Sequence, residues 1–436
     1  MRALPASPTC AGAGRCPVAG NEVATCGAPI ADVILPGGTA VFGFQGFQSQ
    51  TVKGFGYWPA GEGVRTVGAD GAETKAALSG DGKVYVVRVE QGRLVDYRVG
   101  SEALVRRTWE GALAPDDHLM SAESVGDSLI ARVAVRSYSP SSRDVIAGPS
   151  GTFQSRDVPA PPGSWSYPNV VTHSSDRQGV GLAYGPAGVG VIVDQATWMV
   201  PHTVARTAAA RDILLPVEGQ PHPVLAFKSF DGGERSGAHV LFPKAPFARG
   251  SRVPVTDVHL LAGRLERKND CPQRPDATPR VCTRTEIDSQ GVALARTGDG
   301  RVWVSFLVTR REHRARFQIV CPPPPRCAPG EPCRQAPCED RQSDVRDSVR
   351  HELMVYRLGT GGAGAELGYS YELADSAGVD ILVGLDMAAI GSELHIAFKF
   401  GDFKVRRVRL DTSAMSPVAL AADGVARIET ELTPVP

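Results

Sequence analysis

The chain has 436 residues, of which 47 are basic and 47 acidic, so its formal net charge is zero. This balance argues against a nucleic-acid partner, because phosphate recognition needs an excess of basic side chains. The hydrophobic content of 42% excludes wholesale disorder, and no apolar run reaches the length of a transmembrane helix.

The first 32 residues contain Cys10, Cys16 and Cys26, and we expect this segment to be disordered or a linker. Its opening, MRALPASPTC, lacks the apolar stretch of a secretory signal, so no signal peptide is visible. Cys10 is a candidate for lipid modification, whereas Cys16 and Cys26 are candidates for a disulfide. The remaining residues, 33–436, are predicted to form one folded domain.

From residue 33 onward, short runs of β-branched and aromatic residues alternate with polar ones and are separated by Gly, Asp-Gly and Pro turns. The runs KVYVVRV at 83–89 and RVWVSFLV at 301–308 are typical. The best helical periodicity is short and covers about 203–214. The pattern therefore predicts an all-β chain.

The strand pattern also repeats. AALSGDGKVYVVRV from Ala76 and VALARTGDGRVWVSFLV from Val292 each place a Gly-Asp-Gly turn between two strands. Similar units begin near residues 40, 76, 124, 180, 224, 292 and 387. The intervals between them are 36, 48, 56, 44, 68 and 95 residues, and removing insertions at about 268–280 and 309–348 brings the two largest toward roughly 45–60. The first unit is short of one strand, which 33–35 or 425–432 would supply.

Four-stranded units at this spacing resemble the blades of β-propeller repeat proteins. The resemblance rests on the period and the hairpins alone, because the Gly-His and Trp-Asp signature of WD40 repeats and the paired glycines of kelch repeats are absent. It implies a single β-propeller over 33–436, with seven blades favoured over six. Two β-sandwiches are the competing architecture.

The other cysteines lie in or beside the predicted insertions. They are Cys271, Cys282, Cys321, Cys327, Cys333 and Cys338. Clustered loop cysteines indicate disulfides or a metal site, and the segment CPPPPRC is a poor zinc knuckle because its prolines hold the two ends apart. We therefore expect disulfides, no metal and no cofactor. Disulfides in turn predict an extracytoplasmic location.

Two short motifs are better explained as turns than as catalytic elements. Residues 126–129 spell GDSL, as in the nucleophile block of an esterase family, but no Asp-x-x-His accompanies them. Ser229-Phe-Asp231 begins like the Asp-box of sialidase-like propellers and then departs from it. The nine histidines are scattered singly, so we predict no catalytic residue.

One recurring pattern is a candidate for ligand binding. Asp288-Ser289 and Asp375-Ser376 are each followed by x-Gly-Val, and Asp176-Arg-Gln-Gly-Val is a partial third copy. In a propeller these segments would link one blade to the next, on the face that carries the second-to-third-strand hairpins. Asp, Ser and Gly also form turns for local reasons, so the structural interpretation stays open beside the functional one.

These features predict a non-catalytic extracytoplasmic binding or scaffold module. We expect it to be a monomer with a protein or glycan ligand. The first alternative is a glycan-active hydrolase or lyase with two carboxylates across the channel mouth. The second is a structural surface or adhesion component.

Overall fold

The structure is a computed structural model of the chain, and almost every element in it is a β-strand. The residues that it describes are 2–3, 18–24, 36–45, 53–59, 62–68, 73–79, 81–100, 104–114, 117–134, 142–158, 170–173, 179–185, 188–193, 196–201, 208–214, 222–229, 237–261, 280–320, 339–373, 382–400, 404–415, 418–419 and 425–435. The prediction of an all-β, propeller-like fold is confirmed: consecutive strands pair antiparallel in small sheets that follow one another along the chain.

Three sheets form the N-terminal part of the body. The first contains β3 (Ala40–Gln45), β4 (Lys53–Trp58) and β5 (Arg65–Gly68). The second contains β6 (Thr74–Leu78), β7 (Val84–Glu90), β8 (Arg93–Val99) and β9 (Val105–Trp109). The third contains β10 (His118–Val125), β11 (Ser128–Ala134), β12 (Ser142–Ala147) and β13 (Phe153–Val158). In each sheet the spatial order is the sequence order, as expected for hairpin-connected units.

The middle of the chain forms one nine-stranded sheet made of two four-stranded units. The first unit is β14 (Val170–His173), β15 (Gly179–Gly185), β16 (Gly188–Val193) and β17 (Ala196–Met199). The second is β18 (Ala208–Leu214), β19 (Val224–Ser229), β20 (Gly237–Pro243) and β21 (Val253–Leu261). The C-terminal strand β30 (Val425–Pro434) joins them by pairing with both β17 and β21.

The last two sheets each take up a strand from elsewhere in the chain. One contains β22 (Arg280–Arg296), β23 (Val302–Val320), β24 (Glu339–Leu358), β25 (Ala365–Leu373) and β29 (Val418–Ala419). The other contains β26 (Leu382–Ile390), β27 (Glu393–Phe400), β28 (Lys404–Asp411), β2 (Val18–Ala24) and β1 (Arg2–Ala3). Three short 3-10 turns complete the elements: η1 (Pro36–Gly38), η2 (Thr360–Gly362) and η3 (Thr412–Ala414).

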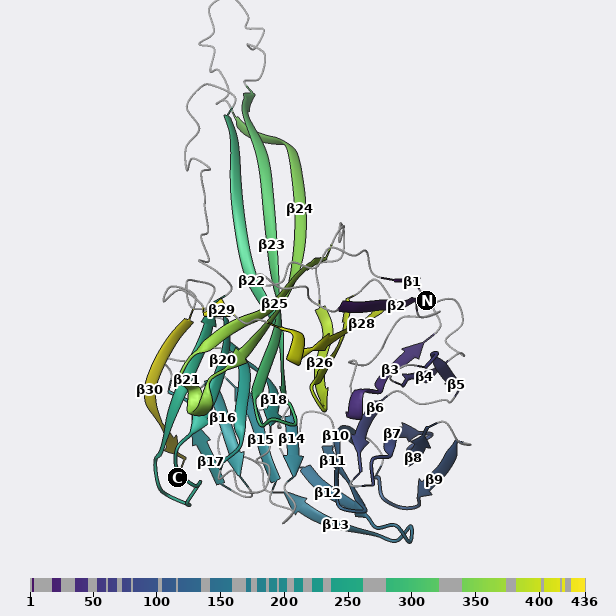
Figure 1. Cartoon of the computed structure of the whole chain (residues 1–436). Helices are drawn as coiled ribbons and strands as arrows, with labels where there is room; N and C mark the ends of the chain where they lie inside the picture. Colours follow the sequence, from purple (N-terminus) through teal and green to yellow (C-terminus); the bar gives the residue numbers. More distant parts are fainter. Residues whose placement is uncertain are drawn as a thin grey trace, which may run out of the picture.

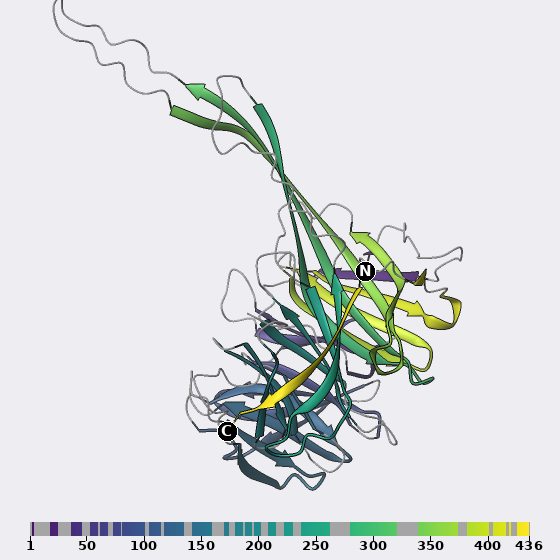
Figure 2. The same ribbon diagram turned by 90° about the vertical axis from the view of Figure 1, so that its left-hand side faces the viewer.

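A three-stranded arm rises from the body (Figure 1), and the view turned by 90° shows the same projection (Figure 2). We define the arm as 280–288, 310–320 and 339–350, the distal parts of β22, β23 and β24. Thr309 and His351 lie opposite each other at its base, and their side chains are hydrogen bonded at 2.9 Å. Most of the insertion expected at 309–348 is therefore a continuation of paired strands, and 321–338 lies outside the described residues. Of the insertion expected at 268–280, only Arg280 is described.

Three local expectations differ from the structure. The helical stretch expected at about 203–214 contains strand β18, because tertiary pairing with β19 overrides a short helical pattern. The N-terminal segment is not only a linker, since Val18–Ala24 pairs with β28. Among the described residues the first sheet has three strands: the C-terminal candidate for its missing strand pairs with β21 instead, and the other candidate, 33–35, lies outside the described residues.

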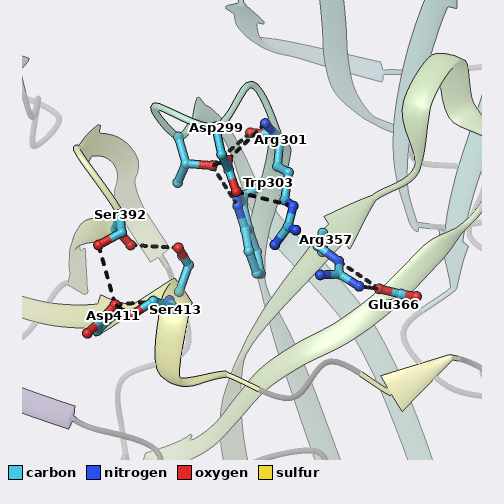
Figure 3. Close-up of polar contacts among 10 residues, drawn as sticks. Asp299, Arg301, Trp303, Arg357, Glu366, Ser392, Asp411 and Ser413 are labelled. Atoms are coloured by element: carbon cyan, nitrogen blue, oxygen red, sulfur yellow. Dashed lines mark hydrogen bonds and ion pairs between the residues drawn. The ribbon is translucent and has the colours of Figure 1, made fainter.

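The repeat detected in the sequence is visible in two equivalent turns, 79–83 and 297–301. In each turn the backbone N–H of the first residue donates to the carbonyl of the fifth, at 2.8 and 3.0 Å. Its side-chain hydroxyl donates to the aspartate at the third position, Asp81 or Asp299. The glycine that follows has φ of 77° or 82°, which is why Asp-Gly suits this turn. Figure 3 shows Asp299 next to Arg301 in the second turn.

Apolar side chains fill the spaces between neighbouring sheets. Val41 and Phe55 of the first sheet pack with Val86 of the second in one buried cluster. Further clusters join the second sheet to the third, β14–β17 to β18–β21, β18–β21 to β22–β25, and β22–β25 to β26–β28. Phe42 also packs with Val405, which joins the first sheet to the last. Central strands are therefore covered on both faces and read as nearly continuous apolar runs.

Candidate functional site

Of the five predicted binding residues, the structure describes only Asp288 and Ser289. Asp176, Asp375 and Ser376 lie outside the described residues. Asp288 and Ser289 lie inside β22, opposite Thr309 and Val308, and not in a loop between sheets. The Ser289 side chain is fully buried, and its Oγ has no hydrogen-bond partner among the described residues.

The glycine of this motif has a local structural role. The register between β22 and β23 shifts between Gln290 and Ala293, and Gly291 has φ of 65° at that irregularity. A bulge of this kind requires a positive φ, which glycine adopts without strain. The glycine part of the structural interpretation therefore applies here, within a strand, whereas no local hydrogen bond of the Ser289 side chain among the described residues accompanies it.

The candidate disulfide cysteines and the candidate lipidation site are not described, except that Cys282 lies in β22. The GDSL segment is a tight turn, as expected: Val125 pairs with Ser128, and Gly126 has φ of 56°. Ser229, the first residue of the partial Asp-box, ends β19, and the rest of that motif lies outside the described residues.

A polar cluster that the sequence reasoning missed lies where the first strands of two neighbouring sheets begin. Glu73 directly precedes β6, and His118 is the first residue of β10. The Nδ1 atom of His118 lies 2.6 Å from Oε1 of Glu73. The backbone N–H of Leu119 donates to the other oxygen of the same carboxylate. Glu73 is thereby held by two groups, and it orients the imidazole from one side.

The two side chains of this pair remain accessible. The exposed fraction is 47% for the side chain of His118 and 26% for that of Glu73. This combination of an oriented ring and partial exposure suits proton transfer to a bound molecule, because an imidazole can accept and donate a proton and a carboxylate fixes its tautomer. We call Glu73 and His118 the Glu73–His118 pair.

A second carboxylate next to this pair is buried and engaged. Asp117 accepts from the backbone N–H of Ala114 at 2.8 Å and from Nη2 of Arg143 at 2.5 Å. Its side chain is 1% exposed. Arg143 also donates to the carbonyl of Ala112 at 2.9 Å, so Arg143 links Ala112 to Asp117, the residue before His118.

Other histidines belong to buried packing. His239 stacks between Phe227 and His259, with ring centroids 5.1 and 4.0 Å away, and its Nδ1 lies 2.9 Å from Asp257. All three residues beside His239 are buried, so this ladder is not open to a ligand. The expectation of isolated histidines was wrong here, because cross-strand register brings together residues that are distant in the sequence.

Neither a metal centre nor a membrane span is found in the part of the chain that the structure describes. No three His, Cys, Asp or Glu side chains there are grouped to hold a metal ion. No helix there has the length and apolarity needed to cross a bilayer.

Comparison with known proteins gives no family. No family model matches the chain, and no curated protein matches it. Among solved structures, an engineered GH43 glycoside hydrolase with endo-xylanase and exo-arabinofuranosidase activity matches with a TM-score of 0.26 and 9% identity. The match covers 91% of this chain and 81% of the hydrolase. A bifunctional GH43-CE protein of Bacteroides eggerthii matches with a TM-score of 0.27 and 10% identity. That match covers 91% of this chain, which spans about half of the Bacteroides protein, 53%.

This finding corrects the main functional prediction. The sequence analysis favoured a non-catalytic binding or scaffold module, whereas both of these structures are of glycoside hydrolases. The alternative, a glycan-active enzyme, is the hypothesis that we retain. These matches assign neither a substrate nor a functional residue to this chain.

Proposed function

We propose that this chain is a glycan-active hydrolase or lyase in which the Glu73–His118 pair transfers protons. The observation that carries the proposal is the 2.6 Å contact between His118 Nδ1 and Glu73 Oε1 at the start of two neighbouring first strands. In propeller-like folds, loops and strand ends at the channel mouth are where a rigid scaffold presents reactive groups.

The burial of Asp117 favours a histidine-based reaction over a pair of catalytic carboxylates. Carboxylate-pair glycosidases need both groups at the substrate, roughly 5–10 Å apart. Asp117 is enclosed and held by Arg143, so it supports the turn and does not face a sugar. His118 would act as the general base, and Glu73 would keep it in position.

The proton transfer fits two reactions with different products. In hydrolysis, His118 takes a proton from water, the water oxygen bonds to the sugar carbon, and the glycosidic C–O bond breaks with protonation of the leaving oxygen. In a lyase reaction, His118 takes the proton next to a uronate carboxyl group, a C=C bond forms, the C–O bond breaks without water, and the leaving oxygen receives the proton that His118 holds. The product of the second reaction absorbs ultraviolet light.

The test is a panel of neutral and uronate-containing polysaccharides, assayed for new reducing ends and for ultraviolet absorbance. We expect His118→Gln to lower kcat by about 10²–10⁴-fold, the usual contribution of a general acid–base group. Glu73→Gln should lower kcat more than it changes KM, because it disturbs the position of the imidazole. Glu110→Gln, an exposed partner of Arg93, is the matched control. Absence of turnover on every glycan, or full activity of His118→Gln, would refute the proposal.

We further propose that the sheets close into a ring of seven blades, with β14–β17 and β18–β21 counted separately. Three observations support this count. The first and last sheets share an apolar cluster, η1 lies against β6 and β26, and β2 supplies a fourth strand beside β28. An N-terminal strand on the last sheet is a way to fasten a ring. An experimentally determined structure with six units, or an open ring, would contradict the count.

The cysteine pattern supports an extracytoplasmic location with disulfides, and this also remains our proposal. Intact mass measured with and without reductant and a thiol label would count the disulfides. The same measurement on exported protein would reveal a lipid on Cys10. Nine free thiols would overturn the disulfides.

A further inference from the structure

Arginines occupy directly opposite positions on one face of the arm. Arg310 of β23 pairs with Arg350 of β24, and both are exposed. Arg350 lies 3.7 Å from Glu372, whereas Arg310 makes no ion pair with any residue that the structure describes. Like charges directly across a strand pair disfavour the pairing. Two opposed arginines therefore need a reason beyond the stability of the sheet.

The same arrangement recurs one step farther from the body. The backbone register places Arg314 opposite Arg346, with Glu312 and Ser348 at the intervening positions. Arg316 follows on β23. The β22 positions that pair with this face carry no charge: they are Ile287, Thr285, Thr283 and Val281. We call this side, with Arg310, Arg314, Arg316, Arg346 and Arg350, the basic face of the arm.

The opposite face of the arm has a different composition. Glu286 of β22 lies opposite Arg311 of β23. Farther from the body, His313 of β23 lies between Arg284 of β22 and Asp347 of β24. Charges of both signs alternate there, which is what solubility and protection of strand edges require. Solvation alone does not explain why positive charge is in excess on one of the two faces and balanced on the other.

We propose that the basic face of the arm binds an acidic glycan, a polymer whose carboxylate or sulfate groups meet the successive arginines. The inference rests on the proposed glycan activity and extends it to the substrate class. Arg310 to Arg316 spans about 20 Å at roughly 3.3 Å per strand residue, which is long enough for a few sugars of an extended chain. Guanidinium groups bind carboxylate and sulfate through paired hydrogen bonds.

A glycan fits these observations better than a nucleic acid. The chain as a whole is neutral, so it lacks the wider positive field that phosphate backbones require. The arginines follow one narrow face of three strands, and the other face of the same strands is mixed. A single flexible polyanion can lie along that face.

The experiment measures binding of dextran sulfate, polygalacturonate and unmodified dextran by affinity electrophoresis and calorimetry. It uses the His118→Gln full-length chain, so that no substrate is consumed. We expect binding of the two acidic polymers and none of dextran, with affinity that falls as salt is added. The double variant Arg310→Gln/Arg350→Gln should raise the Kd for the acidic polymers by about tenfold or more.

The matched control is Arg93→Gln/Arg252→Gln, which removes two exposed, ion-paired arginines from the body. It should bind as the parent does. The inference would be overturned if both double variants weakened binding equally, or if unmodified dextran bound. It would also be overturned if duplex DNA bound more tightly than the acidic polymers and lost as much affinity in Arg310→Gln/Arg350→Gln. If His118→Gln remains active and still binds the acidic polymers, the proposed catalytic role of the Glu73–His118 pair is refuted. The proposed binding by the basic face is then unaffected.

Discussion

Arg407 of β28 donates from Nη1 to the backbone carbonyl of Trp58 at 3.1 Å, which joins residues 349 positions apart. The same nitrogen reaches the carbonyl of Pro59 at 3.0 Å, and the guanidinium lies 5.7 Å from the centre of the Trp58 ring. Burial lowers the pKa of Arg407 to about 10, with a further contribution from Arg409. The last sheet is thus tied to the first by a charged side chain that is almost wholly buried.

Replacing this side chain should destabilise the fold. Arg407→Met leaves two carbonyls without their donor and is expected to lower the free energy of unfolding by about 2–3 kcal/mol. Arg409→Met, at an exposed position 3.8 Å from Glu393, should change it by less than about 0.5 kcal/mol. Urea unfolding followed by tryptophan fluorescence measures both. Equal effects would show that Arg407 does not hold the first and last sheets together.

His395 should make stability depend on pH below neutrality. Burial and the Arg407 charge lower its pKa from 6.5, outweighing the opposite effect of Glu393, and Arg409 adds to the lowering. Below about pH 6.5, His395 therefore binds a proton more readily in the unfolded chain than in the folded chain. The free energy of unfolding consequently falls as the pH decreases from about 6.5. His395→Gln should flatten this part of the stability curve. An unchanged slope in His395→Gln would assign the dependence to other groups.

The two equivalent turns should respond alike to substitution. A Cβ on Gly82 or Gly300 meets no atom within 4 Å, so the cost of alanine comes from φ of 77° and 82° alone. We expect each variant to lose about 1 kcal/mol of stability, and Gly100→Ala, also in open space but without a positive φ, to lose less. Unequal losses from the two turns would contradict their equivalence in the native state.

The ion pair of Arg132 and Asp144 offers a test of a buried charge. Arg132 donates to both oxygens of Asp144 at 2.6 and 2.9 Å, and both side chains are at most 4% exposed. Asp144→Asn should cost about 3 kcal/mol or more, because it leaves a buried guanidinium without its counter-charge. Arg132→Met/Asp144→Leu should recover most of this loss. If the double variant is less stable than Asp144→Asn, the attraction between the two charges stabilises the fold by more free energy than their desolvation costs.

Local sequence patterns predicted much of the fold and little of the candidate site. The hairpin at Val125 and Ser128 and the paired Asp-Gly turns follow from residues that are adjacent in the chain. The Glu73–His118 pair joins residues 45 positions apart, and neither residue belongs to a motif. The sequence marks this pair only by position, because each residue lies at the beginning of the first strand of a sheet.

The sequence by itself determined the strands, their turns and their repetition, because alternation, β-branching and glycine φ act within a few residues. The tertiary structure alone decided which sheet receives β2 and that β30 joins β17 to β21. It also decided that the strands after Thr309 continue as a paired arm. These pairings depend on which strand edges lie side by side in the folded chain. Backbone hydrogen bonds between two strands form in the same way whether the strands are near or far apart in the sequence, so local sequence patterns do not specify the partner.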